Sequence, residues 1–148
     1  MLQGSTSLQK PAYEKLKFYQ DICEIRKSIS IITNRILSKY PRLASQIRDA
    51  ARSAKQNIRE GYRKGGAGEF ARGIVISQGS FEELSGDCED CRDDGLISDK
   101  EFEKLSKLFQ SASYMSTKFL ASLYKMDGAG KWKVPLASLK KRYYKKVT

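Results

Sequence analysis

Apolar residues recur with a helical period along most of the chain, and this pattern constrains the fold more than any other feature. Between residues 13 and 38 they step by four and three positions, at Phe18, Ile22, Ile25, Ile29, Ile32 and Ile36. Such steps place side chains on one face of an α-helix. Similar patterns cover residues 42–64, 67–94 and 98–125, and no strand-like alternation of useful length occurs. The sequence therefore predicts four amphipathic helices.

The segments between these stretches contain the residues that end and begin helices. Pro41 ends the first helix or starts the second, and a run of glycines follows residue 64. Gly95 suits the end of the third helix, and Ser98 with Glu101 fits a capping box for the fourth. Short connections between amphipathic helices are typical of an all-α, up-down-up-down antiparallel four-helix bundle.

A chain of 148 residues fits one such domain with flanking segments. We expect residues 13–126 to form the bundle and residues 1–12 to be a disordered N-terminal segment. Residues 127–148 form a basic, aromatic C-terminal tail that follows a glycine-rich hinge. The first eleven residues lack the apolar core of a signal peptide, and we expect a cytoplasmic protein.

The formal charge of +11 is unevenly distributed. Residues 35–72 contain ten cations and three anions, whereas residues 80–104 contain ten anions and three cations. Residues 128–148 add seven cations and no anion. This layout indicates two kinds of partner surface: an anionic polymer suits the basic parts, and a basic neighbour, such as another copy of the chain, suits the acidic segment.

A row of cations runs along the second predicted helix beside its apolar face. The spacings within this row are four, three, four and four, which confines it to an arc of about 80°. Such a row is either a solvated face, a partner for the acidic third helix, or a surface that binds a phosphate backbone and releases counterions. We interpret it as the last of these. The candidate nucleic-acid-binding residues here are Arg48, Arg52, Lys55, Arg59, Arg63 and Lys64.

The C-terminal tail interleaves aromatic and basic residues. Trp132, Tyr143 and Tyr144 can stack on unpaired bases while neighbouring cations hold phosphates. The alternatives are docking on a partner protein or contact with anionic lipid, and the short apolar part makes a membrane the weakest of these. The candidate nucleic-acid-binding residues of the tail are Lys140, Lys141, Arg142, Lys145 and Lys146.

The side chain that most often serves as a general base is missing. The chain has no histidine, which removes the common general base and the usual nucleophile–histidine pairs. Cys88 and Cys91 form a CxxC pair but also fit the apolar face of the third helix, and we interpret them as core residues. The segment GYRKGGAGE resembles a phosphate cradle, yet a helix-hairpin turn explains it better. We expect no catalytic residue, no metal site and no cofactor.

Four motifs in order resemble those of a known family. Asn57–Gly61, Glu69–Phe70, Gly79–Leu84 and Gly95–Ile97 are similar to the motifs of bacterial four-helix-bundle proteins encoded in intervening sequences of 23S ribosomal RNA genes. The resemblance covers about residues 13–125. The same family includes the accessory variability proteins of diversity-generating retroelements, which resemble this chain in size and basicity.

The resemblance implies a homopentamer of four-helix bundles. For the retroelement members it also implies binding to nucleic acid and to a reverse transcriptase, without catalysis. The chain departs from the family pattern at Arg59, where alanine is usual, and at Gly66, where serine is common. We therefore expect a non-catalytic nucleic-acid-binding scaffold of low sequence specificity that assists a reverse transcriptase. The alternative is an intervening-sequence-encoded structural or protein-interaction oligomer without a nucleic-acid role.

Overall fold

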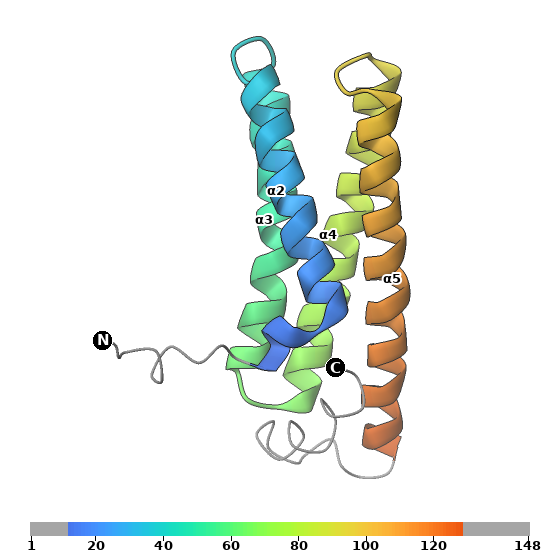
Figure 1. Cartoon of the computed structure of the whole chain (residues 1–148). Helices are drawn as coiled ribbons and strands as arrows, with labels where there is room; N and C mark the ends of the chain where they lie inside the picture. The colour runs from blue at the N-terminus through green and yellow to red at the C-terminus, as the bar shows by residue number, and fades with distance from the viewer. Residues whose placement is uncertain (1–11, 129–148) are drawn as a thin grey trace, which may run out of the picture.

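The computed structural model describes the backbone of residues 12–128 and the side chains of residues 12–125. A short 3-10 helix, η1 (Ala12–Lys15), precedes four long helices: α2 (Lys17–Ile36), α3 (Pro41–Arg63), α4 (Ala67–Asp93) and α5 (Asp99–Gly128). They run alternately up and down the molecule (Figure 1). The expected all-α four-helix fold is confirmed over the described residues, which contain no strand. Residues 1–11 of the expected N-terminal segment and residues 129–148 of the expected tail lie outside them.

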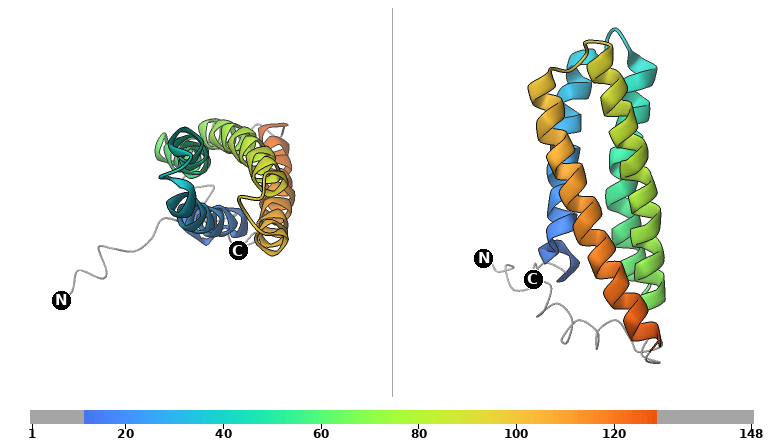
Figure 2. Two further views of the ribbon diagram at one scale, coloured as in Figure 1. Left: turned by 90° about the horizontal axis from the view of Figure 1, so that it is seen from above. Right: turned by 90° about the vertical axis from the view of Figure 1, so that its right-hand side faces the viewer.

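Each helix packs mainly against two others. α2 and α4 both contact α3 and α5. Seen from above, the four helices stand at the corners of a square, with α3 and α5 on one diagonal (Figure 2). This arrangement separates the exposed surfaces of α3 and α5, which makes one a useful control for substitutions on the other.

The predicted helix ends are found with the expected chemistry. Pro41 is the first residue of α3, where its missing N–H costs nothing. Gly65 and Gly95 follow helix ends with φ angles of 90° and 75°, a left-handed conformation that favours glycine. The capping box is confirmed: the Ser98 N–H donates to Glu101 Oε1 at 2.9 Å, and the Glu101 N–H donates to Ser98 Oγ at 3.1 Å.

The predicted apolar faces form the core. The six apolar residues of the α2 pattern, residues 18–36, are each no more than 6% exposed. Phe119 of α5 lies 5.7 Å, between ring centroids, from both Phe18 of α2 and Phe70 of α4. Leu108 and Met115, which lie off the α5 seam, are half-buried and pack against this core.

Two glycines allow α3 and α4 to cross at very short distance. A Cβ atom built on Gly61 would lie 2.6 Å from the Glu69 carbonyl oxygen and 3.2 Å from Gly73 Cα. A Cβ atom on Gly73 would overlap the Asn57 carbonyl oxygen. One turn further along, Ser77 Oγ donates to the Ala54 carbonyl oxygen at 2.5 Å. The backbones of α3 and α4 are therefore in direct contact near the α3–α4 turn.

An ion pair joins α2 to α5 at the opposite end of the bundle. Both terminal nitrogens of Arg35 donate hydrogen bonds to the Glu101 carboxylate, at 2.6 Å to Oε2 and 3.1 Å to Oε1. The hydrogen bonds from Arg35 and Ser98 lower the pKa of Glu101 from its ordinary value of 4.5 to about 2. The folded state therefore binds this proton less readily than the unfolded state, so the pair stabilises the fold fully above about pH 4.5 and loses that effect toward pH 2.

We expect Glu101→Gln to remove this acid-dependent stability. Because both side chains are partly exposed, the loss at neutral pH should be about 1 kcal/mol or less. Glutamine still serves a capping box, so the variant isolates the charge. Urea unfolding at pH 7 and pH 3 measures the effect: the free-energy difference between variant and wild type should shrink on acidification. A difference that is equal at both pH values would contradict the assignment.

Candidate nucleic-acid interface

The predicted row of cations lies along α3 beside its buried apolar face. Arg52, Arg59 and Arg63 are exposed, whereas Arg48 and Lys55 are half-buried. Lys64 is exposed and caps the C-terminal end of α3, directly after Arg63. The row therefore reaches the surface along the length of α3. We call Arg48, Arg52, Lys55, Arg59 and Arg63 the basic row.

The basic row borders α2 and not the acidic helix α4. Arg48 Nε donates to Thr33 Oγ1 of α2 at 2.6 Å, and a terminal nitrogen of Arg48 donates to Asn34 Oδ1. Near the other end, burial raises the pKa of Tyr19 on α2, and the charge of Arg59 acts against this rise. Within the described residues no ion pair joins a member of the row to α4, so the structure does not support the alternative that α4 neutralises the row.

Little negative charge opposes the basic row within the described residues. Asp49 lies 3.8 Å from Arg52, but both side chains are about two-thirds exposed, and such pairs contribute little. The two acceptors that hold Arg48 are uncharged. In this part of the chain no carboxylate comes within ion-pair distance of Lys55, Arg59 or Arg63. Lys64, beside the row, lies 3.8 Å from Glu69.

The structure adds one arginine that the sequence pattern missed. Arg26 of α2 lines a hollow of about 170 Å³ together with Arg48 and Arg52 of α3. Arg26 belongs to no basic run in the sequence. Its only signal is its place next to Ile25, at the edge of the apolar face of α2, where a long side chain reaches the neighbouring helix.

The remaining predicted site residues fall in the C-terminal tail. Lys140, Lys141, Arg142, Lys145 and Lys146 lie outside the described residues, and so do the three tail aromatics. Within the described residues the candidate interface therefore consists of α2 and α3.

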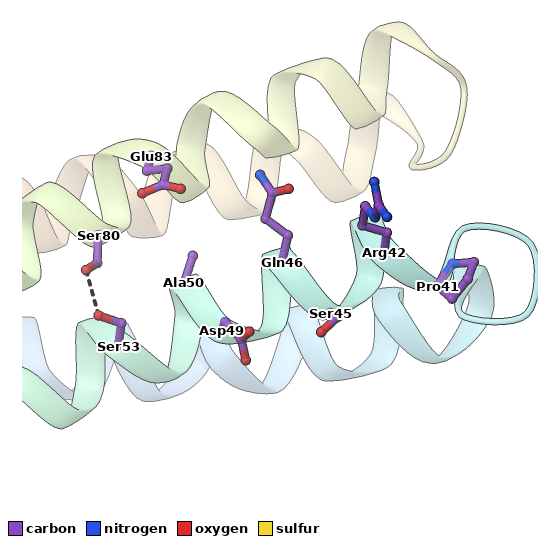
Figure 3. Close-up of a pocket in the computed structure, with 9 residues that line it drawn as sticks. All are labelled: Pro41, Arg42, Ser45, Gln46, Asp49, Ala50, Ser53, Ser80 and Glu83. Atoms are coloured by element: carbon purple, nitrogen blue, oxygen red, sulfur yellow. Dashed lines mark hydrogen bonds between the residues drawn. The ribbon is translucent and has the colours of Figure 1, made fainter.

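A second hollow, of about 730 Å³, lies between α3 and α4 (Figure 3). Its lining mixes charges, with Arg42 and Asp49 on α3 and Glu83 on α4. A hydrogen bond of 3.0 Å between Ser53 Oγ and Ser80 Oγ joins its two walls (Figure 3). These lining residues include no nucleophile paired with a base, and the mixed charge does not favour a polyanion.

The glycine-rich segment after α3 forms a helix-hairpin turn, as interpreted from the sequence. The Gly65 N–H donates to the Tyr62 carbonyl oxygen at 3.2 Å, and the Phe70 N–H donates to the Gly66 carbonyl oxygen at 3.0 Å. Gly66 precedes α4 without a side-chain cap, consistent with the missing serine. These two backbone hydrogen bonds close the turn between α3 and α4.

The acidic surface of α4 is separate from the basic row. Glu82, Glu83, Glu89 and Asp90 are exposed there. Asp87 is half-buried; burial raises its pKa, and the charges of Glu83 and Asp90 raise it further. The molecule thus carries opposite charges on different helices, as its sequence indicates.

The CxxC pair is part of the core. Cys88 and Cys91 are 2% and 3% exposed on the buried face of α4. Burial raises the pKa of Cys88 to about 12, which keeps the thiol protonated and opposes thiolate chemistry. No group of three histidine, cysteine, aspartate or glutamate side chains in the described part of the chain could hold a metal ion.

Fold and charge together define the class: a four-helix bundle with a cationic edge formed by its first two long helices. The sequence matches the 23S rRNA-intervening sequence protein family over residues 14–118, and the chain belongs to this family. The resemblance inferred from four short motifs is thereby confirmed. No curated protein matches the chain significantly. None of the described helices is both long and apolar enough to cross a membrane.

Proposed function

We propose that this protein is a non-catalytic scaffold that binds RNA or DNA through phosphate contacts. The observation that carries the proposal is the basic row, which is largely exposed and borders α2 with little carboxylate charge opposite it. A line of arginine and lysine side chains about 20 Å long suits successive phosphates of one strand. Phosphate contacts fix position and carry no base information, so low sequence specificity follows.

We further propose that the scaffold acts in the cytoplasm as a homopentamer and assists a retroelement reverse transcriptase. This part rests on the family resemblance. Several copies in one particle would repeat the basic row and strengthen binding through avidity. The acidic surface of α4 offers a separate place for a basic protein partner.

A second candidate function is a structural or protein-interaction oligomer without a nucleic-acid role. The observation that favours it is the exposure of large apolar side chains on several helices. Ile31 of α2 and Tyr114 of α5 are each 63% exposed, and Val75 and Ile76 of α4 are nearly half exposed. Such side chains are common at contacts between subunits.

Binding to a labelled single strand in rising salt tests the lead proposal. If one copy engages about five phosphates, affinity should fall roughly 100- to 500-fold between 50 and 200 mM salt. Oligonucleotides of equal length and unrelated sequence should bind alike. Fluorescence anisotropy measures both the salt dependence of the affinity and the affinities for the different sequences. Absence of binding at low salt, or binding that ignores salt, would overturn the proposal and favour the second candidate.

A further inference from the structure

The hollow between α2 and α3 differs from the rest of the basic row in being enclosed on two sides. Arg26, Ile29 and Ser30 line it from α2, and Arg48, Ala51 and Arg52 line it from α3. Three arginines and a serine therefore share the lining with an apolar floor of two buried side chains, Ile29 and Ala51. An apolar floor lowers the local dielectric and strengthens hydrogen bonds to an ion.

Arg48 is held in place by neutral groups. Thr33 is fully buried, and its hydroxyl donates to the Ile29 carbonyl oxygen at 2.7 Å, which leaves its oxygen to accept from Arg48 Nε at 2.6 Å. Asn34 Oδ1 accepts from a terminal nitrogen. The arginine side chain is thus oriented without being neutralised. Of its five N–H donors, two are used in these bonds, and the others remain for a ligand.

Charge and size indicate a small oxyanion as the ligand. Within the described residues no carboxylate pairs with Arg26 or Arg48, and the contact between Arg52 and Asp49 is long and exposed. At about 30 Å³ for each water molecule in the liquid, the hollow has room for a phosphate group. Planar guanidinium groups suit phosphate because they can donate two parallel hydrogen bonds.

We propose that this pocket seats one phosphate group and thereby fixes the register of the bound strand on the basic row. The proposal rests on the proposed function for the source of the phosphate, a nucleic-acid backbone. Arg26, Arg48 and Arg52 hold the phosphate oxygens, and Ser30 supplies a hydroxyl. Thr33 is a positioning residue, because it is fully buried and acts on the phosphate only by accepting the hydrogen bond that orients Arg48.

Titration with inorganic phosphate tests the pocket without a nucleic acid. Arginine Nε–Hε signals are followed by NMR, with sodium chloride at matched ionic strength as the control. Signals of Arg26, Arg48 and Arg52 should shift and saturate with phosphate, and that of exposed Arg63 should not. Shifts that follow ionic strength equally for all arginines would overturn the proposal.

Two matched pairs of variants test the role in strand binding. Arg48→Lys keeps the charge but loses the planar guanidinium that can donate two parallel hydrogen bonds. Affinity for the oligonucleotide should therefore fall about tenfold. Arg72→Lys, at an exposed position of α4 outside the basic row, should change it little. Thr33→Val removes the acceptor and should weaken binding several-fold, whereas Thr33→Ser keeps the hydroxyl and should bind like wild type. Thermal melting confirms that each variant folds.

The outcomes separate this proposal from the function on which it rests. If the wild type binds the oligonucleotide but Arg48→Lys and Thr33→Val bind equally well, the pocket is wrong and the scaffold function stands. If phosphate saturates the pocket while no oligonucleotide binds, the pocket stands as a site for free phosphate, and the scaffold function fails.

Discussion

Gly73→Ala is expected to destabilise the bundle more than the same substitution at any other described glycine. The new Cβ atom would overlap the Asn57 carbonyl oxygen and lie 3.1 Å from Gly61 Cα, and both obstacles are backbone atoms that cannot rotate away. Separating α3 from α4 would loosen the core along their whole contact. We expect a loss of about 3 kcal/mol or more in the free energy of unfolding, measured by urea denaturation.

Gly79→Ala on the same helix is the matched control. Apart from the neighbouring backbone of its own helix, no atom lies within 4 Å of a Cβ at this position, and alanine favours a helix more than glycine does. This variant should be more stable than wild type by up to about 1 kcal/mol. If the two substitutions had similar effects, the close approach of α3 and α4 would not be a feature of the folded protein.

Reversing the charge of Arg52, Lys55 and Arg59 to glutamate is expected to abolish nucleic-acid binding. The triple variant removes three phosphate contacts and places three anions beside the strand, so affinity should fall at least about 100-fold at low salt. Anisotropy measures the affinity, and sedimentation measures the oligomeric state. All three positions reach the surface, so the helical content should not change.

The control carries the same net charge on another surface. Lys107, Lys118 and Lys125 are exposed on α5, diagonally across the bundle from α3. Their replacement by glutamate should reduce affinity far less. An equal loss in both variants would mean that only total charge matters. Dissociation of the oligomer by the α3 variant alone would instead identify the basic row as a subunit contact.

The sequence predicted the helices because their local signals agree with the packing. The period of apolar residues, Pro41 at the start of α3 and the capping box of Ser98 and Glu101 each depend on neighbours a few positions away. The basic row could be predicted from the sequence for the same reason. Its members share one helix, so their common face follows from helix geometry alone.

Contacts between helices are harder to predict from the sequence than the helices themselves. Gly61 lies in a family motif and Gly73 lies in none, and nothing in either segment of the sequence shows that the two glycines meet. Arg35 adds to the positive charge of residues 35–72, yet it forms an ion pair with Glu101, which is distant in the sequence. Which neighbour the basic row borders depends on the rotation of α3 about its axis, and Arg26 entered the site for the same reason. Spacing along one helix does not fix that rotation.

All six residues that line the pocket come from α2 and α3, which follow each other directly along the chain and are joined by a short turn. Closing one local hairpin therefore assembles it, without any distant segment. Substitutions on α4 and α5 leave its lining untouched. During evolution the surfaces of α4 and α5 could thus change to suit new protein partners while the pocket between α2 and α3 keeps the same lining residues.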